Sequence, residues 1–538
     1  MMLTTIALAA ALAVSAPRLV VVVSIDQFRT DFLTRYAHLY RPATADDGVG
    51  GFRYLMENGA FFVNALHDHI PTETGPGHAS IGTGAPPGIH GIVGNAWYVK
   101  GRSVYCTEDA DARDVLTGGA SSSARNLLTS TFVEEAEKAT GGRAVTVSLA
   151  LKDRAAILMA GRTADVVLWF NGARLSWTTS TAYRPDGRLP SWVEAWNERR
   201  TPARAAGTTW SVSLPASAHL LARPTSRPGV SGEFGTTFPH RLPSDEAALF
   251  NAWRMTPMAN QYTLETAAEA VRAMEMGRDE VPDVLVVGLS ANDYLGHSFG
   301  PDSPEVLEMC VRTDAALSDF LRFLAGAVPG GLDSVAIVVT SDHGVASVPE
   351  DEAALGIPSR RVSPTAILQV VSEVLEEEFG TADLYASTSG DGILGIYFDE
   401  AKCKAAETDS YTAALQVRHA LRGHSDVFAV FLLGDFDEPW MDDDPLTRKV
   451  RRSIVYGRSP DVIIVPRPGV YVSAYPTGTG HGTPWQYDSN VPILMSGPWF
   501  RKGVFTERCT PEDIAPTVCH LIGAQRPSGC QGNVIGLR

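Results

Sequence analysis

Six acidic and imidazole side chains, scattered along the 538 residues, have the chemistry to bind divalent metal ions together. Carboxylate oxygens and imidazole nitrogens without thiolates are typical of an open, hydrolytic Zn²⁺ site rather than a closed structural one. A single Asp at a strand end is more often a helix cap, and a single His is more often an ordinary surface or core residue, so the prediction depends on the whole set. The set is Asp26, Asp293, His297, Asp342, His343 and His481.

The local sequence around these residues suits metal binding. Asp293 and His297 are four residues apart in NDYLGH, so one helical turn would place both on the same face. Asp342 and His343 are adjacent, and they can approach the same ion only at an irregular strand end. His481 lies in the glycine-rich stretch GTGHGTPW, which leaves room for an ion against the backbone. These contexts favour a hydrolytic metal centre.

Thr74 stands among small residues in DHIPTETGPGHASIGTG, residues 68–84, without a neighbouring base. A hydroxyl is a poor nucleophile at neutral pH unless a base, a cation or a metal ion activates it. Thr74 is therefore either a turn residue or a nucleophile whose activating group lies elsewhere in the chain.

Several short β-branched runs end abruptly in polar residues. RLVVVVSID ends at Asp26, DVLVVGLSAND at Asp293, VAIVVTSDHG at Asp342 and His343, and RAVTVSLALKDR at Lys152 and Arg154. Continuous apolar runs of this kind are typical of parallel strands that are covered on both faces.

Helical patterns lie between these runs, as in residues 303–326, where Ser303 is a good N-cap and Gly326 can end the helix. The alternation predicts an α/β fold with a doubly wound, mostly parallel central sheet flanked by helices. Ligands of such sheets bind outside the carboxyl ends of the strands, where the polar residues stand.

Two regions depart from this alternation. Residues from about 169 to 258 are rich in Trp, Ser, Thr, Pro and Arg, and residues from about 382 to 431 give a strand, a helix and a strand. We expect one catalytic domain over residues 17–538, with these two regions as cap-like insertions.

The chain begins with MMLTTIALAAALAVSA, an apolar stretch that is too short to span a bilayer and ends in small residues. Residues 1–16 are therefore predicted to be a signal peptide, although no basic residue precedes the apolar run, and part of the run could belong to the first strand instead. We expect a periplasmic or secreted protein without a stable membrane span. The six cysteines are compatible with one or two disulfides, and the net charge of −16 argues against nucleic acid as a partner.

Six motifs, in this order along the chain, resemble the alkaline phosphatase superfamily: SID, TETGPGH, HGIVGNAWY, NDYLGH, TSDHG and GHGTPW. They are most similar to the branch that nucleotide pyrophosphatase/phosphodiesterases share with PafA-type alkaline phosphatases. The resemblance extends from about residue 19 to residue 522, nearly the whole chain.

The resemblance implies that the site binds two Zn²⁺ ions and that each motif residue has a defined role there. One zinc would be held by Asp26, Asp342 and His343, and the other by Asp293, His297 and His481. Thr74 would be the nucleophile on the first zinc, so that the metal replaces the missing base. His78 would support the turn of Thr74 with Glu73 flanking it, and Asn95 would donate a hydrogen bond to a phosphoryl oxygen.

Lys152 and Arg154 bear on the class of substrate. They are two residues apart, so in an extended segment they would point the same way. This K-x-R resembles the phosphate clamp of PafA-type monoesterases, and two cations suit a dianionic monoester. The expectation is a zinc-dependent alkaline phosphatase that hydrolyses small-molecule phosphate monoesters through a phosphothreonine intermediate.

Two other functions compete with this expectation. A phosphodiesterase or nucleotide pyrophosphatase would use the same pair of metal ions, but a diester carries one charge less and needs an apolar slot for its second group. A zinc-dependent binding protein on an inactive scaffold would be expected to lack the nucleophile or a ligand, and none is missing. A sulfatase is disfavoured because the Cys/Ser-x-Pro-x-Arg motif is absent from this position. The sequence does not set the physiological substrate or the oligomeric state, and a monomer is compatible with it.

Overall fold

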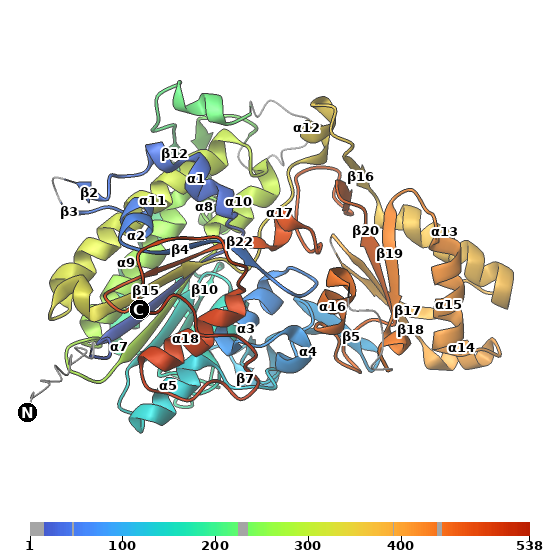
Figure 1. Ribbon diagram of the computed structural model, residues 1–538, viewed down its shortest axis with the longest axis horizontal. Coiled ribbons are helices and arrows are strands. Elements are labelled where there is room, and N and C mark those ends of the chain that lie inside the picture. Colours follow the sequence, from blue (N-terminus) through green and yellow to red (C-terminus); the bar gives the residue numbers. More distant parts are fainter. Residues whose placement is uncertain (1–14, 46–47, 224–234, 391, 438–443) are drawn as a thin grey trace, which may run out of the picture.

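The computed structural model describes residues 15–45, 48–223, 235–390, 392–437 and 444–538 (Figure 1). The predicted signal peptide therefore lies, except for its last two residues, outside the described residues. The main feature is a nine-stranded sheet with the order β11-β10-β9-β14-β1-β15-β22-β4-β23. Its strands are β1 (Leu19–Ile25), β4 (Gly59–Leu66), β9 (Thr146–Ala150), β10 (Val166–Asn171), β11 (Ser176–Thr178), β14 (Asp283–Leu289), β15 (Val335–Thr340), β22 (Asn490–Ser496) and β23 (Gly503–Phe505).

The middle of the sheet is parallel. β1 pairs in parallel with β14 on one side and with β15 on the other, and β9 and β10 continue the parallel arrangement. β22 runs antiparallel to both β15 and β4. Every residue of β1, β14 and β15 is buried, as expected for strands covered on both faces. The predicted α/β fold with a mostly parallel central sheet is confirmed.

The two faces of the sheet belong to two hydrophobic cores. In β1 the side chains of Val21 and Val23 pack in one core, whereas Val20 and Val22 pack in the other. Helices α9 (Pro257–Ala273) and α11 (Pro304–Ala327) cover the first face, and α5 (Phe132–Thr140), α6 (Asp153–Ala160) and α18 (Ile514–Leu521) cover the second.

Helix α11 shows how local sequence sets its ends. The Ser303 hydroxyl accepts a hydrogen bond from the Val306 backbone N–H, and Pro304 occupies the first helical position. The helix ends at Ala327, one residue beyond the predicted Gly326, because the cap residue Val328 adopts an extended conformation.

The region predicted from residue 169 to residue 258 packs on the first face through aromatic side chains. Trp177 and Trp196 both donate their indole N–H to Thr266 of α9, and both stack on Tyr262. This region contributes α7 (Ser191–Glu198) and α8 (Glu246–Trp253). The aromatic residues therefore attach it firmly to the main core.

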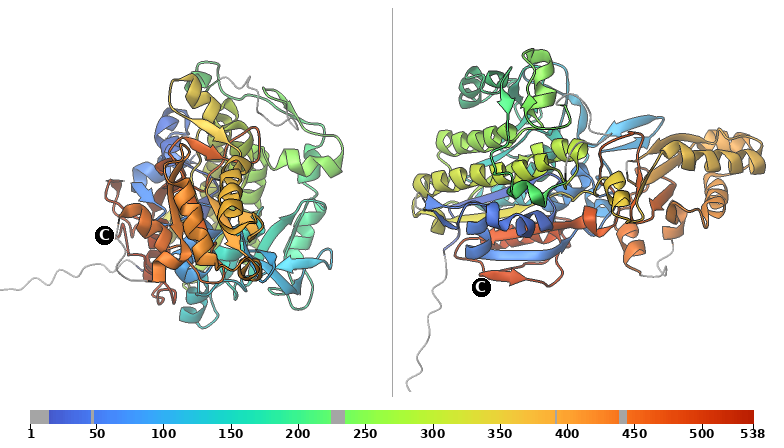
Figure 2. Two further views of the ribbon diagram at one scale, coloured as in Figure 1. Left: turned by 90° about the vertical axis from the view of Figure 1, so that its right-hand side faces the viewer. Right: turned by 90° about the horizontal axis from the view of Figure 1, so that it is seen from above.

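A smaller lobe lies at one end of the long axis of the molecule (Figures 1 and 2). It has its own core and a four-stranded sheet in the order β17-β18-β20-β19, with three helices beside it. It extends beyond both predicted limits, 382 and 431. Helix α13 precedes residue 382 and packs in the core of the lobe, and β20 follows residue 431 and pairs between β18 and β19. Its elements are α13 (Pro364–Phe379), β17 (Tyr385–Ser389), β18 (Leu394–Phe398), α14 (Glu400–Ala405), α15 (Ser410–Leu421), β19 (Val427–Leu432) and β20 (Val462–Pro466).

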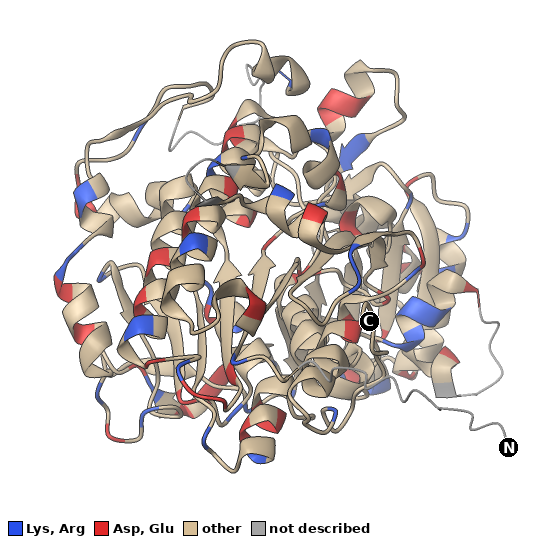
Figure 3. Cartoon of the chain, turned by 60° about the vertical axis from the view of Figure 1, so that its left-hand side comes forward, with Lys and Arg blue, Asp and Glu red and all other residues tan. Residues whose placement is uncertain are grey.

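Acidic and basic residues are interspersed over the helices and loops in Figure 3, so the net negative charge is not confined to one element. All six cysteines are free thiols, five of them buried. Among the described residues, no helix combines the length and the apolar character that crossing a bilayer requires.

Candidate active site

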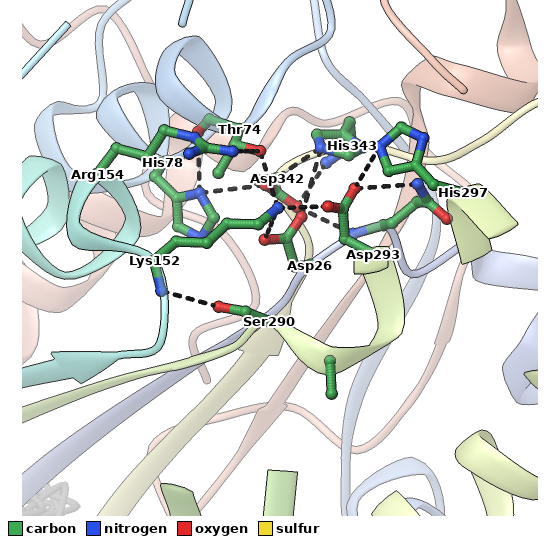
Figure 4. A network of polar contacts seen from close by, with 12 residues as sticks. Asp26, Thr74, His78, Lys152, Arg154, Ser290, Asp293, His297, Asp342 and His343 are labelled. Atoms are coloured by element: carbon green, nitrogen blue, oxygen red, sulfur yellow. Dashed lines mark hydrogen bonds and ion pairs between the residues drawn. The ribbon is translucent and has the colours of Figure 1, made fainter. Parts of the chain in front are cut away.

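Three neighbouring strands deliver the acidic residues to one edge of the sheet. Asp26 follows β1 directly, Asp342 follows β15, and Asp293 lies in the first turn of α10 (Ala291–Phe299), which follows β14. Because these strands are parallel and adjacent, their carboxyl ends meet at the same edge. Figure 4 shows the three carboxylates facing one another, each at most 5% exposed.

Two groups of side chains are close enough to hold metal ions. The ligand atoms of Asp26, Asp342 and His343 lie within 4.8 Å of one another, and so do those of Asp293, His343 and His481. His297 is one turn after Asp293 on α10, and its Nε2 lies 3.2 Å from Asp293 Oδ1. All six predicted ligands are therefore brought together, with His343 within reach of both groups.

Each of the three imidazoles is oriented by a backbone carbonyl. Nδ1 of His297, His343 and His481 lies 2.8, 2.9 and 2.7 Å from the carbonyl oxygens of Thr479, Gly344 and Thr72. A carbonyl only accepts, so Nδ1 carries the proton and Nε2 keeps its lone pair for the cluster. This arrangement is typical of metal-binding histidines.

The donor atoms fit divalent cations. Among the described residues, no hydrogen bond reaches Oδ1 of Asp26 or Nε2 of His343, although both are buried. Burial, together with the charges of Asp342 and Asp293, raises the pKa of Asp26 well above its usual range. A carboxylate in such a place needs a cation beside it, which a bound divalent metal ion would supply.

Lys152 supplies one positive charge to this cluster. Its Nζ lies 2.6 Å from Asp26 Oδ2 and 2.5 Å from Asp293 Oδ2, and the side chain is 1% exposed. Burial opposes ionisation of Asp293, but Lys152 and His297 outweigh it and hold the pKa of Asp293 well below its usual range.

Thr74 is the first residue of α3 (Thr74–Thr83), and its hydroxyl faces two cations. Lys152 Nζ and Arg154 Nη2 each lie 3.3 Å from Thr74 Oγ1 (Figure 4). The expectation that Lys152 and Arg154 meet through an extended segment is wrong. Lys152 is the N-cap of α6 and Arg154 lies in its first turn, so the two converge across a strand-to-helix turn.

Helix α3 lies directly on the end of β15. His78 Nδ1 is 2.9 Å from the Thr74 carbonyl oxygen and 3.1 Å from Asp342 Oδ2, so it links the turn of Thr74 to the acidic cluster. A Cβ atom on Gly77 would lie 2.2 Å from the Asp342 carbonyl oxygen. Only glycine permits this approach, which sets the distance between Thr74 and the carboxylates.

Asn95 lies beside Thr74. Its Oδ1 accepts a hydrogen bond of 2.8 Å from the Gly75 backbone N–H, which leaves its amide nitrogen free to donate. Glu73, which the sequence placed only as a flanking residue, accepts a hydrogen bond of 2.7 Å from the Asn95 backbone N–H. Glu73 therefore positions the Asn95 loop.

Sequence reasoning missed two further positioning residues. Gln27 adopts a left-handed conformation with φ of 61°, and it donates hydrogen bonds to Asp293 and Asp342. Tyr105 donates to Asp153 at 2.7 Å and accepts from Arg154 at 3.2 Å, which holds the guanidinium towards Thr74. Gln27 could have been identified from the sequence, because it directly follows the SID motif. Nothing in the sequence indicated the role of Tyr105.

Comparison with known proteins places the chain in a family. Residues 20–491 match the type I phosphodiesterase/nucleotide pyrophosphatase family. Alkaline phosphatase PafA of Elizabethkingia meningoseptica is 33% identical over 97% of this chain and 94% of its own length. Alkaline phosphatase PhoV of Synechococcus elongatus is 32% identical over 97% of this chain and 93% of its own. The crystal structure of wild-type PafA matches with a TM-score of 0.88 at 32% identity, over 97% of this chain and 99% of that one.

The chain has the fold of the alkaline phosphatase superfamily, as the motifs predicted. Within it, the chain belongs to the type I phosphodiesterase/nucleotide pyrophosphatase family, and its likeness to PafA-type alkaline phosphatases extends over nearly all of its length.

Proposed function

We propose that this protein is a metal-dependent alkaline phosphatase that hydrolyses phosphate monoesters through a phosphothreonine at Thr74. The observation that carries the proposal is the position of the Thr74 hydroxyl, 3.3 Å from both Lys152 Nζ and Arg154 Nη2 and beside the carboxylate cluster. The names of the curated relatives, alkaline phosphatases PafA and PhoV, support the same reaction.

The proposed metal content is two Zn²⁺ ions. Asp26, Asp342 and His343 would hold one ion, and Asp293, His297 and His481 would hold the other. When bound, such ions supply Lewis acidity that stabilises an ionised hydroxyl and takes up charge on phosphoryl oxygens. The choice of zinc is supported by ligands that are carboxylate oxygens and imidazole nitrogens without thiolates.

The reaction then proceeds by two displacements. Thr74 Oγ1 attacks phosphorus in line with the bond to the leaving oxygen, which breaks as the Thr74 O–P bond forms. Water next displaces Thr74 from phosphorus, releasing inorganic phosphate and restoring the hydroxyl. Through both steps Lys152, Arg154 and the Asn95 amide hold the transferring group with preorganised charge and hydrogen bonds.

Two cations beside the nucleophile favour a monoester. A monoester presents a dianionic phosphoryl group, whereas a diester presents one charge and a second organic group. Buried carboxylates hold Lys152 and the partly buried Tyr105 holds Arg154, so neither cation can easily move aside to make room for the second group of a diester. The arrangement therefore selects the more highly charged substrate.

Replacing Lys152 and Arg154 one at a time tests the preference for monoesters over diesters. Lys152→Ala and Arg154→Ala should each lower kcat/KM for phenyl phosphate by about 10²–10³-fold, the usual cost of removing one preorganised donor. For methyl phenyl phosphate, the matched diester, the loss should stay below about tenfold, because its single charge depends less on each cation. Lys138→Ala, an exposed residue of α5, is the control and should change neither rate constant.

A phosphodiesterase is the second candidate, because the family that the chain matches is described by that activity. It would be favoured if the wild-type enzyme hydrolysed methyl phenyl phosphate faster than phenyl phosphate, and if both variants kept that order.

We further propose that residues 1–16 are a signal peptide, residues 17–538 the catalytic domain, and the mature enzyme periplasmic or secreted. The apolar run ending in small residues supports the export of the chain.

A further inference from the structure

A cavity of about 500 Å³ lies beside the metal-binding residues. One wall is α10, which contributes Tyr294 and His297, the neighbours of Asp293. The lining also includes Arg254, whose guanidinium lies over the Tyr294 ring, and Tyr471 and Tyr475. Because His297 lines it, the cavity is continuous with the predicted second metal group.

Lys152 connects this cavity to Thr74. Its Nζ lies 3.3 Å from Thr74 Oγ1 and 5.1 Å from the centre of the Tyr294 ring. A phosphoryl group held at Thr74 and Lys152 therefore has the cavity next to it, on the side of His297. In the proposed reaction the ion that Asp293, His297 and His481 would hold would take up charge on the leaving oxygen, so this is the side of the leaving group.

Arg254 is a partly buried cation that has no acidic partner among the described residues. Its guanidinium lies 4.4 Å from the centre of the Tyr294 ring and 5.5 Å from that of Phe250. Within the described part of the chain it forms no ion pair, and its buried Nε has no hydrogen-bond partner. Keeping the Nε donor from water without an acceptor is costly, and no described carboxylate neutralises the guanidinium, so it is suited to receive an anion.

Arg361, which contacts the lining residues Tyr471 and Gly478 without lining the cavity itself, shows the contrast. Its guanidinium lies 5.3 Å from the centre of the Tyr471 ring, but it is paired with Glu350 at 2.9 Å and donates to the Gly478 carbonyl at 2.7 Å. None of the ten residues that line the cavity, all of them described, is Asp or Glu. Arg254 is therefore the arginine at this cavity whose positive charge no carboxylate of the described residues balances.

We propose that the cavity binds the leaving-group half of the substrate, and that Arg254 binds a second anionic group, a carboxylate or a phosphate, on that half. This inference rests on the proposed monoesterase function, which sets the phosphoryl group at Thr74. The substrate class is then a phosphate monoester of a small alcohol that carries its own negative charge. The tyrosine walls supply contact area for the carbon skeleton between the two anions.

The test compares two esters that differ at the far end of the alcohol, 3-phosphoglycerate with a carboxylate and glycerol 3-phosphate with a hydroxymethyl group. With metal-loaded wild-type enzyme, kcat/KM should be higher for 3-phosphoglycerate by about tenfold or more, as expected for one charge-assisted contact. Arg254→Met, which keeps an apolar stem against Tyr294, should lose this preference while changing glycerol 3-phosphate hydrolysis by less than about threefold.

Two variants complete the comparison. Arg254→Lys keeps the charge without the planar fork and should retain part of the preference. Arg53→Met, on α2 (Phe52–Asn58) and outside the cavity, should retain all of it. Propane-1,3-diol bisphosphate and its monophosphate, measured in the same way, show whether phosphate is preferred over carboxylate.

The outcomes separate this inference from the function on which it rests. The inference would be overturned if the wild-type enzyme had equal kcat/KM for the two esters of each pair, the one with a second anionic group and the one without it. That result would leave the monoesterase function intact, and it does not depend on whether Arg254→Met folds. The same holds if Arg254→Met slows all four esters equally, which would indicate a packing role. If wild-type enzyme hydrolyses none of these monoesters but hydrolyses diesters, the proposed function itself fails.

Discussion

Thr74→Ala should lower kcat for phenyl phosphate by at least about 10⁴-fold, the scale of loss when a catalytic nucleophile is removed. Thr74 is 1% exposed and its hydroxyl lies beside two cations and the carboxylate cluster, so water cannot take its place with the same alignment. Acid-quenched wild-type enzyme should contain phosphothreonine at this position by mass spectrometry, and Thr74→Ala should not.

Thr74→Ser is the matched control, because it keeps a hydroxyl at the first position of α3. It should form a phosphoserine and retain much of the activity. The metal content of both variants should equal that of the wild type, because Asp26, Asp342 and His343 remain. If Thr74→Ala turned over phenyl phosphate as fast as the wild type, Thr74 would not be the nucleophile. If the wild-type enzyme were inactive with full metal content, the result would instead support a binding protein on an inactive scaffold.

The strand ends explain why the acidic residues could be predicted from the sequence. Asp26, Asp293 and Asp342 each follow a continuous apolar run, and adjacent parallel strands necessarily bring their carboxyl ends together. The four-residue spacing likewise predicted that His297 and Asp293 lie on the same face of a helix, without any information on the other metal-binding residues. These predictions needed only the period of each element and the direction of the sheet.

Other parts of the site depend on contacts that a single sequence does not encode locally. Lys152 and Arg154 converge on Thr74 across a helix N-terminus, whereas their spacing alone suggested a strand. The cavity joins Arg254, α10 and Tyr475 from three distant segments. Such sites arise from tertiary packing, so only the structure shows that the Arg254 guanidinium lacks a carboxylate partner within the described residues.

The positions of Glu73 and Gln27 illustrate an intermediate case. Both flank residues that the motifs single out, yet their roles follow from hydrogen bonds to residues that are close in space, Asn95 for Glu73 and Asp293 for Gln27. A motif identifies the reacting groups more readily than the groups that orient them, because orientation requires the coordinates of both partners.

Removing the metal ions with a chelator should abolish hydrolysis and also change the stability of the fold. Activity towards phenyl phosphate should fall by at least about 10³-fold, since Lewis-acid stabilisation amounts to several kcal/mol. Zn²⁺ should restore it better than Ca²⁺, because Ca²⁺ prefers six or more oxygen ligands. At a free Zn²⁺ concentration of about 100 times Kd, the bound ion should stabilise the fold by about 2.7 kcal/mol, measured by thermal unfolding.

Asp26→Asn separates the metal's role from a merely structural one. Without metal, the buried carboxylates of Asp26 and Asp293 share the ammonium of Lys152, and the buried carboxylate of Asp342 adds a further negative charge beside Asp26. Removing one negative charge relieves this repulsion, so metal-free Asp26→Asn should unfold at a higher temperature than metal-free wild type. The variant should also gain less from added Zn²⁺ and hydrolyse phenyl phosphate poorly. A metal-free variant that is less stable than wild type, yet binds zinc normally, would show that Asp26 stabilises the fold rather than holding an ion.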